Sequence, residues 1–179
     1  MTGAAAAGER ILVAGVGNIF LGDDGFGVEV VRRLAGRPLP EGVLVADIGI
    51  RGVHLAFELL DGVDLLVLAD AAQRGEQPGT VSVLEVEAAT ATAPGGATTG
   101  GLLMDAHDLA PDAVLGLLGA LGGEVGRTVV VACEPADLTP GIGLSSPVAA
   151  AVDEAVAAIE RIVRARSGDH TDDKENTRC

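Results

Sequence analysis

Aromatic residues are nearly absent from this chain of 179 residues. They make up 2% of it, as three phenylalanines without tryptophan or tyrosine, although 48% of the residues are hydrophobic. Proteins that recognise bases or sugars by stacking need aromatic side chains, so the composition argues against this mode of binding. The core must be built from aliphatic side chains instead.

Positive charge is the second shortage. The chain has 12 Lys and Arg against 26 Asp and Glu, which gives a formal net charge of −14 at pH 7. A nucleic-acid partner needs a basic face for its phosphates, and an anionic membrane surface attracts the same residue types. The sequence therefore predicts neither a nucleic-acid partner nor a membrane surface as partner.

Long apolar runs and cysteine frameworks are lacking as well. No stretch reaches the roughly 18 unbroken apolar residues that a membrane span needs, and residues 1–8 lack the charged start of a signal peptide. Two cysteines, Cys133 and Cys179, do not make a disulfide framework. We expect a soluble cytoplasmic protein, and its length favours one domain.

Short aliphatic runs alternate with amphipathic segments along the chain. Strands are expected at 10–16, 43–47, 63–70, 80–86 and 128–133, and helices at 25–34, 53–60, 111–121 and 145–166. The run at 80–86 alternates apolar and polar residues, which is typical of a strand near an edge. Strands alternating with helices predict an α/β fold, a three-layer sandwich in which a mostly parallel five-stranded sheet carries helices on both faces.

The folded domain is expected to span residues 9–166. Residues 1–8 are interpreted as a flexible N-terminus, and the polar, charged residues 167–179 as a disordered tail. Residues 88–104, which are rich in alanine, threonine and glycine, predict a mobile loop before the third helix.

Acidic side chains follow several of the predicted strands. Asp23 and Asp24 come after the first strand, and Asp47 and Asp70 end the second and third. Ligands of open α/β sheets bind beyond the carboxyl ends of the strands, so these acids are candidates for a site. Capping a helix or a turn is an equally common use of such residues, and Asp23 or Asp24 is expected to cap the next helix.

His107, shortly before the third helix, is the best imidazole candidate for that edge. A lone histidine in a loop is more often a surface residue. Two carboxylates and an imidazole suit a divalent first-row metal and leave positions open for a substrate or water. Spacing alone does not show that such distant residues converge.

Two other chemistries are disfavoured by the residues. Gly15-Val-Gly-Asn begins like a dinucleotide-binding turn, but Phe20 replaces the third glycine, and two carboxylates before the helix would repel a pyrophosphate. No nucleotide cofactor is expected. Cys133 ends a strand with no histidine nearby in sequence, so a buried small hydrophobic role is favoured over that of a nucleophile.

The segment from Gly15 to Val28 carries a family resemblance. It reads Gly-Val-Gly-Asn-Ile-Phe-Leu-Gly-Asp-Asp-Gly-Phe-Gly-Val, which resembles the N-terminal signature of the [NiFe]-hydrogenase maturation endopeptidases. Weaker matches follow in the order that the family has, and the resemblance covers about residues 10–165. They lie at 66–71, 105–109, 134–135 and 142–144.

The resemblance implies both a fold and an activity. Members have a mostly parallel sheet with helices on both faces, and they remove a C-terminal peptide from the hydrogenase large-subunit precursor after nickel insertion. Carried over by motif, the metal ligands would be Asp24, Asp70 and His107. The nickel would arrive with the precursor, which is the implied partner, and we expect the enzyme to be a monomer.

This chain departs from the family pattern at two places. Position 24 is Asp where some members have Glu, which is one methylene longer. After Asp47 the chain reads Ile-Gly-Ile-Arg-Gly where many members have an Asp-Gly-Gly-Thr-like segment. Arg51 is expected to meet the substrate's C-terminal carboxylate or an acidic neighbour. Asp47 is a candidate for the catalytic base or for orienting the site.

The sequence shows no serine-nucleophile motif and no H-E-x-x-H pair. Hydrolysis without a covalent intermediate is therefore expected, with water activated by the metal or by a carboxylate such as Asp47. The sequence leaves open which of the two supplies the base. Two alternatives remain: a non-catalytic accessory protein that binds nickel or the precursor, and a nucleotide-binding domain.

Overall fold

The protein is described from a computed structural model that covers residues 9–86 and 111–166. The predictions for 1–8, 88–104 and 167–179, and those for His107 and Cys179, lie outside the described residues. Within the described ranges, none of the helices has the length and apolar character that crossing a membrane would require.

Five strands form a single sheet in the order β2-β1-β3-β5-β4. They are β1 (Ile11–Val16), β2 (Val43–Gly49), β3 (Val63–Ala71), β4 (Val81–Val86) and β5 (Val125–Cys133). The first four strands in this spatial order run parallel, and β4 pairs antiparallel with β5 at the edge. The predicted mostly parallel sheet is confirmed, and so is the edge position of the alternating run at 80–86.

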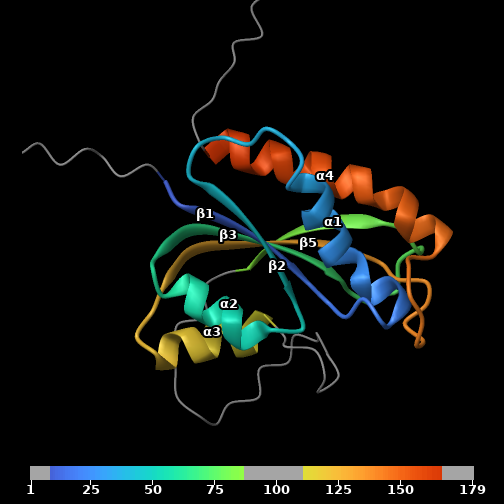
Figure 1. Ribbon diagram of the computed structural model, residues 1–179, viewed down its shortest axis with the longest axis horizontal. Coiled ribbons are helices and arrows are strands. Elements are labelled where there is room, and N and C mark those ends of the chain that lie inside the picture. Colours follow the sequence, from blue (N-terminus) through green and yellow to red (C-terminus); the bar gives the residue numbers. More distant parts are fainter. Residues whose placement is uncertain (1–8, 87–110, 167–179) are drawn as a thin grey trace, which may run out of the picture.

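Helices cover both faces of this sheet, as Figure 1 shows. They are α1 (Phe26–Leu34), α2 (Gly52–Leu59), α3 (Pro111–Ala120) and α4 (Ser146–Arg166), with a short 3-10 helix η1 (Gly22–Gly25) leading into α1. Helices α1 and α4 pack together against one face, and α2 and α3 lie against the other. The three-layer sandwich is confirmed.

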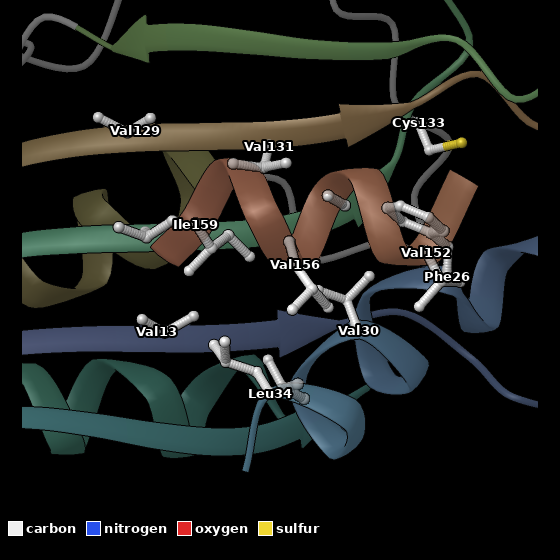
Figure 2. Close-up of a cluster of buried hydrophobic side chains, with 14 of the residues drawn as sticks. Val13, Phe26, Val30, Leu34, Val129, Val131, Cys133, Val152, Val156 and Ile159 are labelled. Carbon is white, nitrogen blue, oxygen red and sulfur yellow. The ribbon is translucent and has the colours of Figure 1, made fainter. Parts of the chain in front are cut away.

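The core is aliphatic, as the shortage of aromatic residues requires. Figure 2 shows Val152, Val156 and Ile159 of α4 lying over the valines of the strands, with Phe26 at one end of the cluster. Fully burying one such side chain stabilises the fold by about 1.5–3 kcal/mol. Phe26 is buried while Phe20 remains 61% exposed, so the position of Phe20 needs a reason other than core packing.

Gly27 allows α1 to lie directly on the sheet. A Cβ at this position would lie 2.0 Å from the carbonyl oxygen of Ala69 and 2.4 Å from that of Val16. Real Cβ atoms do not approach so closely, so only glycine fits between the helix and strands β1 and β3. This contact explains the second glycine of the Asp-Asp-Gly-Phe-Gly motif, and it holds the start of α1 at the carboxyl edge of the sheet.

Candidate active site

The turn between β1 and α1 holds Asp24 in place. Gly17 has a φ of 123°, and a Cβ there would lie 1.9 Å from the main-chain oxygen of Asp24, so glycine is required where the turn closes. The main-chain N–H of Asn18 donates to Oδ2 of Asp24 at 2.6 Å. Asp24 is only 6% exposed, so its carboxylate is held in a defined position.

Asp70 lies at the carboxyl end of β3, beside Ala132 of β5 in the register. It is 6% exposed, and the main-chain N–H of Ala71 donates to its Oδ1 at 2.8 Å. Because η1 contacts β3, the sheet brings the elements that carry Asp24 and Asp70 together. The third predicted ligand, His107, lies outside the described residues.

A complete metal site is not found within 9–86 and 111–166. No group of three or more histidine, cysteine, aspartate or glutamate side chains in these ranges could hold a metal ion. The predicted trio needs His107, so this result does not bear on it. The set of Asp24, Asp70 and His107 therefore stays a prediction.

Neither Asp23 nor Asp24 is the N-cap residue of the next helix, so the expected capping role is wrong. The N-cap residues of η1 and α1 are Leu21 and Gly25, and neither makes a side-chain cap bond. The carboxylate of Asp23 instead accepts the main-chain N–H groups of Ala136 (2.8 Å), Asp137 (2.9 Å) and Ser145 (2.6 Å), and the Ser145 hydroxyl (2.8 Å). The loop at 136–145 lies against η1 and supplies these donors. The sequence around Asp23 does not predict them, because they come from a distant part of the chain.

The electrostatics of Asp23 follow from these bonds. Burial by itself raises the pKa of a carboxyl, but the hydrogen bonds from Ser145, Asp137 and Ala136 outweigh it and hold the pKa of Asp23 below its usual value. Because Asp23 is fully buried, its four bonds fasten the loop at 136–145 to η1. The segment that carries Asp24 is thereby fixed.

Asp47 lies apart from this buried arrangement. It ends the predicted second strand, and its Oδ2 accepts from Nε of Arg32 at 3.2 Å, with Nη2 of Arg32 also at 3.2 Å. The Asp47 side chain is 39% exposed. Sequence reasoning missed Arg32, and no local signal could have found it, since the two residues come from different elements.

A groove of about 390 Å³ opens between the turn after β1 and the turn after β2. It is lined by Gly17, Asn18, Ile19, Phe20, Val28, Arg32, Asp47, Ile48, Gly49, Ile50 and Arg51. Arg51 donates from Nη2 to the carbonyl oxygen of Asp47 at 2.6 Å and from Nε to that of Ile48 at 3.2 Å. The predicted candidates Asp47 and Arg51 thus share one groove.

Cys133 is an inert position in this site. It is fully buried, and burial together with the carboxylates of Asp23 and Glu134 raises the pKa of its thiol to about 11. A thiol in this environment stays protonated at neutral pH, and it is the thiolate that acts as nucleophile. The predicted role as a small buried hydrophobic residue is confirmed.

Glu134, the next residue, has a structural use. Its side chain is largely buried and accepts the main-chain N–H groups of Arg74 at 2.7 Å and Gly75 at 3.3 Å. These bonds fasten the loop after β3 to the end of β5.

Comparison with known proteins places the chain in a family. The family model described as hydrogenase maturation protease matches residues 28–162. The hydrogenase 2 maturation protease of Escherichia coli is 32% identical, over 87% of this chain and 91% of that protein. The hydrogenase expression/formation protein HupD of Rhizobium leguminosarum bv. viciae is 31% identical, over 87% of this chain and 74% of that one.

The solved structures agree with the sequence relatives. The hydrogenase maturating endopeptidase HybD from E. coli has a TM-score of 0.72 at 32% identity, over 87% of this chain and 93% of that one. The two proteins share the α/β fold over most of their length. The chain belongs to the hydrogenase maturation protease family, and it is a peptide hydrolase.

Proposed function

We propose that this protein removes the C-terminal peptide of a [NiFe]-hydrogenase large-subunit precursor after nickel has been inserted. The observation that carries the proposal is the position of Asp24 and Asp70. Both carboxylates are nearly buried at the carboxyl edge of the sheet, on elements that contact one another. Such an edge is where ligands of open α/β sheets bind, and carboxylates are suitable ligands for a divalent metal.

The nickel belongs to the substrate in this proposal. Asp24, Asp70 and His107 complete the coordination of the nickel that the precursor carries, and this contact docks the region to be cleaved. A precursor without nickel offers no metal to these three side chains and is not cleaved. Specificity for the loaded precursor therefore follows from coordination alone.

Asp47 is the protein's own candidate for activating water. Its ion pair with Arg32 orients the carboxylate, and an oriented carboxylate is suited to accept a proton from an attacking water. The nickel of the substrate is the alternative activator. Neither route needs Cys133, whose thiol is buried.

The working form in this proposal is a cytoplasmic monomer that acts on a protein substrate. The net charge of −14 supports a partner other than nucleic acid or an anionic membrane. Size-exclusion chromatography with light scattering on the full chain tests the monomer directly, and a stable dimer would contradict it.

The activity is tested with the precursor in two forms. Purified protein is incubated with nickel-loaded and nickel-free large-subunit precursor, and the shortened product is followed by mass spectrometry. We expect cleavage of the loaded form alone. Equal cleavage of both forms would contradict the nickel check, and precursor binding without product under any condition would favour the non-catalytic accessory protein.

Two substitutions test the assigned residues. Asp24→Asn and His107→Ala should each slow processing by at least about a hundredfold, since each removes a ligand from the docking contact. Asp153→Asn is the matched control, because Asp153 is an exposed carboxylate on α4. Full activity in either site variant would remove that residue from the proposal.

A further inference from the structure

We propose that the groove between the β1–η1 turn and the β2–α2 turn binds an apolar segment of the protein substrate that bears a carboxylate, and that Arg51 binds this carboxylate. The inference rests on the proposed function, because the segment is part of that substrate.

Arg51 differs from most arginines of this acidic protein. Within 9–86 and 111–166, six arginines form ion pairs with carboxylates: Arg32, Arg33, Arg37, Arg74, Arg127 and Arg166. The bonds recorded for the Arg51 side chain in these ranges go to two main-chain carbonyl oxygens, those of Asp47 and Ile48. Among the described residues, this positive charge is thus held in place without an ion pair to a carboxylate.

The geometry of Arg51 suits it to receive a carboxylate. A guanidinium has five N–H donors in a planar fork, so donors remain after the two main-chain bonds. These two bonds orient the fork in advance, which lowers the entropy lost when a ligand binds. A carboxylate is the anion that such a fork binds with two parallel bonds.

Apolar side chains beside Arg51 define the rest of the ligand. Phe20 and Ile50 are 61% and 65% exposed and line the groove, while Val28 and Ile48 are buried beneath it. Two large exposed apolar residues on either side of one groove are typical of a binding site. The occupant that matches this wall and this charge has apolar side chains next to a carboxylate.

The groove lies directly beside the candidate active site. Asn18 lines the groove, and its main-chain N–H holds the carboxylate of Asp24. A substrate segment in the groove therefore lies next to the residue proposed to dock the nickel. Asp47 is already paired with Arg32, which leaves Arg51 as the cation that an incoming carboxylate meets.

The carboxylate can belong to an Asp or Glu side chain or to the C-terminus of the substrate. Three acetylated peptides separate these sources: Ala-Val-Leu-Glu-Val amide, Ala-Val-Leu-Ala-Val free acid and Ala-Val-Leu-Ala-Val amide. Each is titrated into the full-length, 15N-labelled protein while the main-chain amide signals of Asn18 and Gly49 are followed. We expect at least one carboxylate peptide to bind about fivefold tighter than the neutral amide.

Substitution of Arg51 gives the decisive comparison. Arg51→Leu should abolish the preference for the carboxylate peptide, and Arg51→Lys should keep part of it, because the charge remains while the fork is lost. Arg164→Leu is the matched control, since Arg164 also donates to a main-chain carbonyl oxygen, that of Pro38. Equal binding of all three peptides to the unmodified protein would overturn the proposal.

A second pair of variants decides the matter if the Arg51 variants fail to fold. Ile50→Glu and Ile50→Gln have the same shape at an exposed position and differ in charge. A carboxylate at position 50 would compete for Arg51, so Ile50→Glu should bind the carboxylate peptide about fivefold more weakly than Ile50→Gln. Equal affinity of the two variants would contradict the role of Arg51.

Processing kinetics separate this inference from the proposed function. Arg51→Leu should raise KM for the nickel-loaded precursor by a larger factor than it lowers kcat, because Arg51 binds a carboxylate of the substrate and takes no part in the proton transfer proposed for Asp47. An unchanged KM would overturn the inference while the processing activity stands. If the unmodified protein processes no precursor, the proposed function fails, and the peptide titrations still decide what the groove binds.

Discussion

The loop at 136–145 and the groove beside Asn18 hold their polar groups in different ways. The loop is fastened by the buried carboxylate of Asp23, which accepts four hydrogen bonds. Asp47 and Arg51, by contrast, lie at the exposed groove next to uncovered apolar side chains. Asp24 follows Asp23 in the chain and is held by Asn18 of the groove turn, so its position depends on the fastened loop, while the groove is the region that we propose to bind substrate.

This contrast separates two aspartates that are neighbours in the chain. Asp23 accepts its four hydrogen bonds from donors of the protein itself, so it maintains the structure of the site. Asp24 is held by a main-chain N–H of the turn that lines the groove, so its carboxylate lies next to that groove. A buried carboxylate that accepts four hydrogen bonds from one loop is suited to fix geometry.

The largest effect on stability should come from Asp23→Asn. An amide keeps the shape, but its NH₂ group then faces N–H donors, and a charge-assisted network is lost. We expect the free energy of unfolding to fall by about 2–4 kcal/mol, measured by urea denaturation. If Asp23→Asn lowers the free energy of unfolding no more than the neutralisation of an exposed carboxylate does, the structural role of Asp23 is contradicted.

A smaller loss is expected for Ser145→Ala. This change removes the hydroxyl that donates to Oδ2 of Asp23 and leaves the main-chain bond from position 145, so it should cost about 1–2 kcal/mol. Ser146→Ala, at the next and exposed position, is the control. In an Asp23→Asn background the cost of Ser145→Ala should shrink, because the two residues share one network; strict additivity would show that they do not.

The pH dependence of stability should carry the signature of Asp23. Its pKa is lowered in the folded state, so the folded protein binds fewer protons than the unfolded chain in the acid range. The stabilisation from this group is complete at neutral pH, above the unfolded pKa, and is lost as the pH falls through the folded pKa. Urea unfolding measured from neutral to acid pH should therefore show that the free energy of unfolding falls less steeply in Asp23→Asn than in the unmodified protein. An identical slope in the two proteins would contradict this.

Asp47→Asn should have the smallest effect on stability and a large one on activity. Its partner Arg32 lies at the surface, and such ion pairs contribute less than about 1 kcal/mol. If Asp47 activates water, processing should slow by about a hundredfold or more. Arg32→Gln removes the same ion pair and keeps the carboxylate, so it serves as the control. Normal processing by Asp47→Asn would leave the substrate's nickel as the activator.

The strands were predictable where they are buried on both faces. Strand β3 begins at the expected residue and runs one residue longer than expected, because its aliphatic run is continuous. Strand β5 begins earlier, at Val125, where the sequence shows a glycine and an arginine. Val125 and Arg127 pair with Val63 and Leu65 of β3, so pairing with a neighbouring strand extends a segment whose own composition does not predict a strand.

For the site, the sequence predicted only that it lies at the carboxyl edge of the sheet. Strand-end acids pointed to Asp24, Asp47 and Asp70, and the carboxyl edge is where the structure places them. The division between Asp23 and Asp24 was not predictable, since the donors to Asp23 come from positions 113 to 122 residues away. The ion pair of Asp47 with Arg32 likewise joins two elements that are adjacent only after folding.

Local sequence patterns were sufficient to predict the aliphatic sandwich, the order of strands and helices along the chain, and the acids at the strand ends. Periodicity and strand termini are properties of short segments. The shortage of aromatic residues was visible in the composition as well. Only folding determined that Asp23 is a structural residue, that Asp47 is paired with Arg32 and that Arg51 bonds to main-chain carbonyl oxygens. Hydrogen-bond partners are chosen among segments that meet in space, and the amino-acid order does not state which segments meet.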